Sequence, residues 1–326
     1  MNKVFLFIII LSFQSMYSQM YKQSEPFTHT YSIVARDSVT GDIGVAVQSH
    51  WFSVGTTVTY GKAGVGVVAT QSLVNPSYGP KGLALMEQGL SPQQALDALI
   101  ANDEGKMYRQ VAFLNANGDV ATHTGNLCIE AAGHRQGKNF SVQANMMLKN
   151  TVWDAMADTF ENTQGSLSER IMAAMKAAQS EKGDIRGKQS AAILIVKGEA
   201  TGNSWEDTIM DLRVEDHENP VAELERLIEM HKAYDFMNKG DLAMEAGDSK
   251  LAENMYLNAQ QLFPENLEMQ YWYAINLLNN RQFEKAFPIL KSIFKQDENW
   301  RELTARLMKS KLLAISEEEL KQILKL

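Results

Sequence analysis

Three consecutive strand patterns near the N-terminus constrain the fold of this chain more than any other feature. An apolar run at residues 30–35 is followed by turn-type residues at 38–42, and the chain returns through a second run at 43–47. A third run, at 65–69, follows after glycine punctuation. β-Branched residues broken by polar residues and glycine are typical of neighbouring sheet strands rather than of helices. We expect Thr30 to lie at the very start of the first strand.

Strand patterns and helical patterns then alternate up to about residue 232. Strands are predicted at 110–114, 120–123, 141–148 and 208–214. Within residues 183–196, a glycine-rich loop leads into an apolar run that is also predicted to be a strand. Helices are predicted at 81–88, from Ser91 onward, at 152–161, at 167–181 and at 221–232. Helices that occur in pairs between runs of strands favour two packed sheets with helices on their outer faces.

From residue 233 the sequence is helical throughout and shows no strand pattern. Residues that pack closely between helices recur at an interval of 34: Gly240 and Ala274, Ala252 and Ala286, Tyr256 and Leu290. This interval resembles tetratricopeptide repeats, with Pro264 at the end of the first repeat. A plain pair of helical hairpins is the alternative, because Glu298 stands where the second closing proline is expected. Ser316 and Glu319 have capping-box spacing for a last helix at 317–324.

Charge and cysteine content exclude several functions. A formal net charge of −8 and the absence of a basic run argue against nucleic-acid binding, which needs clustered lysine and arginine. Cys128 is the single cysteine, so no intrachain disulfide can form. With no obvious base beside it, Cys128 is better interpreted as a small core residue than as a nucleophile.

The start of the chain has the pattern of an export signal. Lys3 precedes an apolar run at residues 4–13, which is too short to span a bilayer that needs ~20 apolar residues. We predict a signal peptide at 1–18 with cleavage near Ser18, and a mature protein that is exported to the periplasm or secreted. An uncleaved anchor is the alternative, but no stable membrane anchor is expected.

Residues 27–231 resemble the family called domain of unknown function 1028, which is assigned to the N-terminal-nucleophile (Ntn) hydrolase superfamily. The matching motifs include TYSIVARD, TGDIGVAV, AGVGVVATQ, NPSYGPKGL, RQVAFLNANG, GDIRGKQSAA and DLRVEDH, in this order. The resemblance implies an α+β fold, a four-layer αββα sandwich, followed here by the all-α tetratricopeptide-like domain at 233–326. It also implies hydrolysis of an amide bond.

The superfamily mechanism would make Thr30 both nucleophile and base. A threonine hydroxyl is a poor nucleophile unless a base removes its proton, and a free α-amino group with a pKa of ~8 can be that base. Thr30 gains such an amine only if the peptide bond from His29 is cut. Export cleavage near Ser18 leaves residues 19–29 in place, so a second cleavage is required. The alternative is that Thr30 is an ordinary β-branched strand residue.

Further residues are assigned roles around Thr30, each with a structural alternative. Ser32 would face the same side of the strand, as a positioning hydroxyl or a substitute nucleophile. Asp37 would orient the amine of Thr30 or cap its own turn. Asn145 and Asn75 would donate hydrogen bonds to an oxyanion, although Asn75 beside Pro76 is also an ordinary turn residue.

A polar cluster before the strand near residue 190 is the predicted substrate-binding loop. It comprises Asp184, Arg186, Gln189 and Ser190, and Arg186 could bind a substrate carboxylate through two hydrogen bonds. Alternatively, Asp184 and Arg186 pair and merely brace the loop. The histidines at 123, 134 and 217 lack the spacing of a zinc motif, so neither a metal nor a cofactor is predicted.

Two functions remain open from the sequence. The first is an exported amidohydrolase that cleaves a small amide or peptide bond. The second is a catalytically inactive Ntn-fold binding module whose helical repeats dock a protein partner. The sequence leaves the oligomeric state open, a homo-oligomer included.

Overall fold

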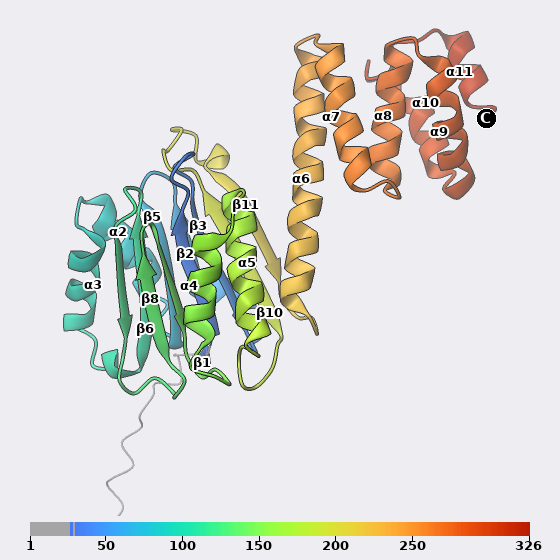
Figure 1. Cartoon of the computed structure of the whole chain (residues 1–326). Coiled ribbons are helices and arrows are strands. Elements are labelled where there is room, and N and C mark those ends of the chain that lie inside the picture. The colour runs from blue at the N-terminus through green and yellow to red at the C-terminus, as the bar shows by residue number, and fades with distance from the viewer. Residues whose placement is uncertain (1–26, 29) are drawn as a thin grey trace, which may run out of the picture. The chain divides into compact units, whose positions relative to one another are not determined.

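The computed structural model describes residues 27–28 and 30–326 (Figure 1). The predicted signal peptide lies outside these described residues. Within them, no helix is long and apolar enough to cross a membrane. The chain divides into two compact units between Glu225 and Arg226. The first unit contains two antiparallel sheets with helices, and the second is entirely helical in its described elements.

The first sheet has the strand order β1-β5-β6-β7, with β4 also pairing with β5. All its pairings are antiparallel. The inward positions of β5 and β6 are apolar over most of their length, which explains why these runs read as buried strands. The bounds are β1 (Phe27–Thr28), β4 (Thr59–Lys62), β5 (Gly66–Leu73), β6 (Arg109–Asn115) and β7 (Val120–Thr124).

The second sheet has the strand order β11-β10-β3-β2-β9-β8 and is also antiparallel. Its two innermost strands, β3 and β2, are the first two strands predicted from the sequence. The bounds are β2 (Thr30–Arg36), β3 (Ile43–Ser49), β8 (Gly133–Gly137), β9 (Phe140–Ala144), β10 (Ser190–Val196) and β11 (Thr208–Val214).

Helix pairs cover the outer faces of the two sheets (Figure 1). Helices α2 (Tyr78–Glu87) and α3 (Pro92–Ala101) pack on the first sheet, and α4 (Val152–Asn162) and α5 (Leu167–Ser180) pack on the second. Serines that cap α3 and α5 form complete capping boxes, as the sequence predicted for α5. Between the sheets, valine, isoleucine and alanine side chains of both sheets form one apolar core. The described part of the unit also contains the short helices α1 (Gly55–Val58), η1 (Lys106–Tyr108) and η2 (Ser204–Glu206).

The structure differs from the sequence predictions at several elements. Helix α1 and strands β4 and β8 were not predicted, because they are short or carry few apolar residues. The strand predicted at 141–148 ends at Ala144, and Met146 then has a positive φ of 58° that breaks the extended backbone. Helix α6 (Pro220–Glu245) is much longer than predicted, so the expected domain boundary at 231–233 falls inside a continuous helix.

The second unit is built from the later part of α6 and five further helices in the described chain. The helices recur at the same interval as the sequence positions described above. Helix α9 begins and ends one such interval after α7, and α8 ends one such interval after α6. The positions that recur in the sequence are buried at helix contacts, including Ala252, Tyr256, Ala274, Ala286 and Leu290. The remaining bounds are α7 (Ser249–Leu262), α8 (Leu267–Asn279), α9 (Phe283–Gln296), α10 (Asn299–Leu307) and α11 (Glu317–Ile323).

Candidate functional site

Thr30 begins β2, an inner strand of the second sheet, and its side chain is completely buried. The directly opposed residue on β3 is Ser49. The carbonyl oxygen of Thr30 accepts hydrogen bonds from the backbone N of Asn145 at 3.0 Å and from Gln71 Nε2 at 3.3 Å. Its hydroxyl is different, because within the described chain Oγ1 has no hydrogen-bond partner. A buried hydroxyl without a partner is unusual and calls for an explanation.

The side chains of Thr30 and Ser32 point between the two sheets. Alternate residues of a strand share a face, and Ser32 Oγ donates to Gln71 Oε1 of the first sheet at 2.6 Å. Ser32 Oγ also accepts from Gln143 Nε2 at 2.6 Å. Both capacities of this hydroxyl are therefore used within the fold, so Ser32 is a structural link between the sheets rather than a free nucleophile.

Beside Thr30, buried amide side chains replace the apolar core between the sheets. Gln71 Nε2 donates to Gln110 Oε1 at 2.7 Å, and Asn145 Nδ2 donates to the same oxygen at 2.9 Å. Gln110 Nε2 in turn donates to the carbonyl oxygen of Ala144 at 2.9 Å. Asn145 Nδ2 also lies 3.4 Å from the carbonyl oxygen of Thr30. Asn145 is thus a residue that positions Thr30.

This amide network was not identified from the sequence, although a signal for it exists. Glutamine occurs once in each of three strands, as Gln71 in β5, Gln110 in β6 and Gln143 in β9, and all three are fully buried. Glutamine is rarely buried unless it is hydrogen-bonded. A buried network whose members satisfy one another fixes a single arrangement of the surrounding strands.

Asp184 and Arg186 form an ion pair at the same end of the sandwich. Arg186 donates to both carboxylate oxygens of Asp184, through Nε at 3.0 Å and an Nη at 2.7 Å. The Asp184 carboxylate also accepts from the backbone N of His50 at 3.2 Å. The same Nη of Arg186 lies 3.5 Å from Ser49 Oγ, opposite Thr30. The predicted loop is thereby brought next to Thr30, with the guanidinium charge balanced by Asp184.

Gln189 and Ser190, the other residues of the predicted loop, brace the surrounding chain. Gln189 Nε2 donates to Asp216 Oδ1 at 3.1 Å. Ser190 Oγ accepts from the backbone N of Val54 at 3.1 Å and donates to the carbonyl oxygen of Trp51. These contacts hold the segment after β3 against the start of β10.

Two predicted site residues, Asp37 and Asn75, hold local turns. Asp37 follows the opposite end of β2, and its Oδ1 accepts from the backbone N of Val39 at 2.7 Å and of Thr40 at 3.0 Å. The role of orienting the Thr30 amine is therefore corrected to turn capping. Asn75 Oδ1 accepts from the backbone N of Ser77 at 3.1 Å, which is the turn alternative.

The opposite face of the strand pair carries buried polar groups of its own. Tyr31 and Gln48 are Cα partners in β2 and β3, and both are completely buried. The hydroxyl of Tyr31 and both polar atoms of the Gln48 amide have no partner in the described residues. Burial, and to a lesser degree the charge of Asp184, raise the pKa of Tyr31 well above its ordinary value. Tyr31 is therefore neutral at physiological pH.

The chain on either side of position 29 belongs to different sheets. β1 pairs with β5 of the first sheet, Phe27 with Leu73 and Thr28 with Ser72, whereas Thr30 pairs within the second sheet. In the intact chain the nitrogen of Thr30 is an amide, because His29 precedes it. The hydroxyl of Thr30 accordingly has no free amine beside it before cleavage.

Six exposed apolar side chains lie in loops and in the short helix η1 at this end of the sandwich. They belong to segments adjoining the strand ends near Thr30, and backbone hydrogen bonds join Met146 to Ile129 and Leu127 to Met107. Phe52 and Ile185 are 63% and 56% exposed. We call the following six residues the apolar rim: Phe52, Met107, Leu127, Ile129, Leu148 and Ile185.

Burial shifts the pKa of two further groups of the first unit, His134 and Cys128. His134 Nδ1 lies 2.8 Å from Thr124 Oγ1, and burial, followed by the charge of His123, lowers the pKa of His134. Burial raises the pKa of the Cys128 thiol, which agrees with a structural role. Over the residues that the structure describes, no group of three or more His, Cys, Asp or Glu side chains could hold a metal ion.

Comparisons with known proteins identify the family of the first unit. The model of a family of unknown function, DUF1028, matches residues 30–224. A crystal structure of a DUF1028 protein from Silicibacter pomeroyi has 29% sequence identity and a TM-score of 0.56. That match covers 62% of this chain and 85% of the other.

A second solved structure is much more distant. Anbu (ancestral β-subunit) from Yersinia bercovieri has 10% identity and a TM-score of 0.31, over 60% of this chain and 92% of its own. A TM-score this low does not establish that the two proteins share a fold. No curated protein matches the chain. Because the DUF1028 model covers more than half of the sequence, as the sequence motifs led us to expect, this chain belongs to the DUF1028 family.

Proposed function

We propose that this protein is an exported Ntn-type amidohydrolase in which Thr30 becomes the nucleophile after cleavage of the His29–Thr30 bond. One observation carries the proposal: Thr30 starts an inner strand with a buried Oγ1 that makes no hydrogen bond in the described chain. A structural threonine at a strand start would satisfy its hydroxyl. A nucleophile instead leaves it available to an amine that appears only after processing.

The chemistry then needs only Thr30 and water. The free α-amine accepts the hydroxyl proton as Oγ1 attacks the amide carbonyl carbon of the substrate. The amine returns this proton to the leaving nitrogen as the C–N bond breaks, which leaves an ester on Oγ1. Water, deprotonated by the same amine, attacks the ester carbonyl carbon. The bond between this carbon and Oγ1 breaks, the acid leaves, and the amine returns its proton to Oγ1, so that Thr30 is regenerated.

The surrounding residues act as positioning groups in this proposal. Asn145 and Gln71 bind the carbonyl oxygen of Thr30 and so fix the backbone that carries both reacting groups. The two amide hydrogens of Asn145 are directed at Gln110 Oε1 and the Thr30 carbonyl oxygen. Asn145 therefore has no spare hydrogen for an oxyanion, and backbone N–H groups are the better donors.

The apolar rim suggests the class of substrate. Its six side chains form an exposed apolar border at the Thr30 end of the fold, and such borders mark binding surfaces. Arg186, the arginine next to Thr30 in the described chain, is already paired with buried Asp184. We therefore propose a substrate amide with apolar groups on either side of the scissile bond rather than an anionic substrate.

The decisive experiment combines N-terminal analysis with variants of the nucleophile. Mass spectrometry of the purified mature protein is expected to find a chain that starts at Thr30. Such a chain should hydrolyse fluorogenic amides of apolar amino acids. Thr30→Ser should retain measurable turnover, whereas Thr30→Ala should lower kcat by about 10³-fold or more, as loss of a nucleophile does.

Ser32→Ala is the matched control, because its hydroxyl serves the fold. It should lose stability but keep an active nucleophile. A mature chain that retains residues upstream of Thr30, together with equal activity of wild type and Thr30→Ala, would reject the proposal.

A second candidate function is a non-catalytic binding module. Two observations favour it: the segment upstream of Thr30 is paired into the first sheet, and the helices of the second unit recur at the interval seen in the sequence. We propose that these helices are tetratricopeptide-like repeats that dock a protein partner, since stacked helix pairs present extended binding surfaces. Both functions can belong to one chain.

A further inference from the structure

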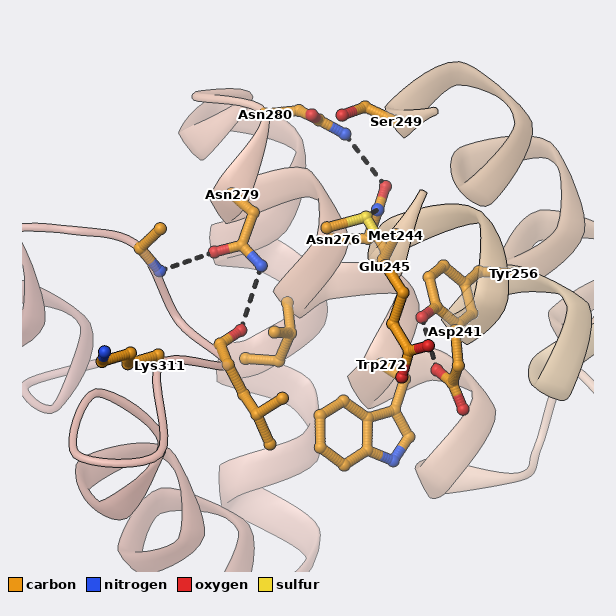
Figure 2. A pocket seen from close by; sticks show the side chains of 13 residues that line it. Asp241, Met244, Glu245, Ser249, Tyr256, Trp272, Asn276, Asn279, Asn280 and Lys311 are labelled. Carbon is orange, nitrogen blue, oxygen red and sulfur yellow. Dashed lines mark hydrogen bonds between the residues drawn. The ribbon is translucent and has the colours of Figure 1, made fainter. Parts of the chain in front are cut away.

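The second unit contains a cavity of about 750 Å³ that none of the assignments above uses (Figure 2). Its volume lies in the range of ~300–1,000 Å³ that is typical of ligand sites. Its lining comes from α6, α7, α8 and the segment before α11, all within the second unit. The lining is apolar in part and carries a few polar groups, as binding sites usually do.

One side of the cavity is acidic and aromatic. Asp241 and Glu245 are four residues apart on α6 and therefore share a face of that helix. Figure 2 shows both carboxylates near the indole ring of Trp272. Tyr256 donates its hydroxyl hydrogen to Asp241 Oδ1 at 2.6 Å. Neither carboxylate has a salt-bridge partner among the residues described by the structure.

A buried amide supplies an additional donor. Asn276 is only 2% exposed, and its Nδ2 donates to the thioether sulfur of Met244 at 3.0 Å. A thioether is a weak acceptor, and an amide nitrogen carries two hydrogens. Asn276 Oδ1 is already occupied by Asn280 Nδ2 at 3.1 Å. The nitrogen of Asn276 can therefore bind a carbonyl oxygen in the cavity and gain a stronger hydrogen bond.

The far wall of the cavity is held in place by Asn279. Its Nδ2 donates to the carbonyl oxygen of Leu312 at 3.0 Å, and its Oδ1 accepts from the backbone N of Ala314 at 2.8 Å (Figure 2). The site is thus largely formed before any ligand arrives, which lowers the entropic cost of binding. Ile275 and Leu312 supply apolar surface between the polar groups.

We propose that this cavity binds an arginine side chain from an extended segment of a partner protein. The guanidinium group would stack on Trp272 and donate to the carboxylates of Asp241 and Glu245. Arginine suits this arrangement better than lysine, because its planar fork combines stacking with bidentate hydrogen bonds. A peptide carbonyl of the partner would accept from Asn276, and flanking apolar side chains would cover Ile275 and Leu312.

Charge complementarity decides between a basic and an acidic occupant. Lys311 lies across the cavity from Asp241 in Figure 2 and is the one cation among the described residues of its lining. Lys311, Asp241 and Glu245 are all exposed, so a single lysine stands against two carboxylates that line the same cavity with Trp272. The proposal does not involve Thr30, and Thr30→Ala is expected to leave this binding unchanged.

The test uses the full chain and a peptide that carries fluorescein on its N-terminal amine, fluoresceinyl-Ala-Leu-Arg-Leu-Ala-amide, with fluorescence anisotropy as the readout. A second peptide replaces arginine by citrulline, which has nearly the same shape but no charge. We expect the arginine peptide to bind at least about tenfold more tightly, as a charge-assisted hydrogen bond predicts. High salt should weaken its binding, because exposed charges are screened.

Protein variants separate this site from nonspecific attraction. Glu245→Gln and Trp272→Ala should each weaken the arginine peptide and remove most of its advantage over citrulline. Glu318→Gln, an exposed carboxylate outside the cavity, is the matched control and should bind as wild type does.

Three results would overturn the proposal. They are equal binding of the arginine and citrulline peptides, tighter binding of a peptide with glutamate at the central position, or no binding of the arginine peptide up to about 1 mM. Because Glu245 is exposed on a helix, its substitution should not unfold the unit. Circular dichroism of each variant checks this point.

Discussion

At the scale of single residues, buried polar side chains distinguish this fold from a simple apolar sandwich. Gln71 and Gln110 lie between the sheets, where their amides satisfy each other and the backbone around Thr30. Removing one such amide leaves its buried partners unsatisfied, at a cost of about 1–3 kcal/mol. The hydroxyl of Thr30 beside this network has no partner in the described chain, as is also true of the Tyr31 hydroxyl on the other face of β2, and only the Thr30 hydroxyl is given a chemical role in the proposed function.

A second buried polar group allows a prediction about stability. Arg109 donates to both oxygens of Asp103, with Nε at 2.8 Å and an Nη at 3.2 Å, and also binds the carbonyl oxygen of Leu73. The two side chains are 3% and 10% exposed. Asp103→Asn would break this buried ion pair by removing the carboxylate charge that Arg109 binds through two hydrogen bonds, so we expect the free energy of unfolding to fall by about 3 kcal/mol.

Urea unfolding at pH 7 measures this loss. The exposed carboxylate of Asp158, which pairs with Arg135, is the matched control, and Asp158→Asn should cost less than about 1 kcal/mol. Equal effects of the two substitutions would show that the buried pair has no special weight.

The pH dependence of this loss has a definite sign. Burial alone would raise the pKa of the Asp103 carboxyl, but hydrogen bonds from Arg109 and from the backbone N of Gly105, with the charge of Arg109, lower it below its ordinary value. The stabilisation is therefore complete above the unfolded-state pKa of about 3.9 and is lost as pH falls through the lower folded-state pKa. The difference in stability between wild type and Asp103→Asn should accordingly shrink below about pH 4. A difference that stays constant down to pH 2 would contradict this linkage.

At the scale of helices and strands, local signals determined the ends of elements most reliably. Ser166 with Glu169 and Ser316 with Glu319 form the capping boxes predicted from their spacing. These signals are local, because the cap side chain binds a backbone N–H three residues away. The sequence predicted a helix at 221–232 and helical structure from residue 233, but it did not predict that α6 continues across this boundary as one helix.

Close approach of α6 to α7 provides a prediction for the helical unit. A Cβ atom at Gly240 would lie 2.7 Å from Tyr256 Cε1, which is too close for a carbon pair. Overpacking of this kind costs about 1–3 kcal/mol, so Gly240→Ala should destabilise the second unit despite the better helix propensity of alanine. Thermal unfolding measures the effect.

The pairing of these two residues can be tested directly. The double variant Gly240→Ala with Tyr256→Leu should lose less stability than the sum of the single variants, because the smaller side chain relieves the overlap. Strict additivity would show that the two side chains do not compete for space.

At the scale of the whole molecule, each unit has apolar cores of its own. The clusters of the first unit lie between the sheets and under α2 and α3, and those of the second lie among its helices. We therefore expect calorimetry to resolve two unfolding transitions.

Variants assign these transitions. Asp103→Asn should lower the melting temperature of one transition and Gly240→Ala that of the other. A single transition that both variants shift equally would show that the units unfold together.

The sequence by itself determined the order of most elements, the helix caps, the change to an all-helical chain and membership of the DUF1028 family, because these depend on residues near one another in the chain. Only the tertiary structure brought Asn145, Gln71 and Ser49 to Thr30, and Arg186 to Ser49. It also gathered two carboxylates, an indole and an amide around one cavity. Such groupings depend on strand register and helix packing between segments far apart in sequence, which local periodicity does not encode.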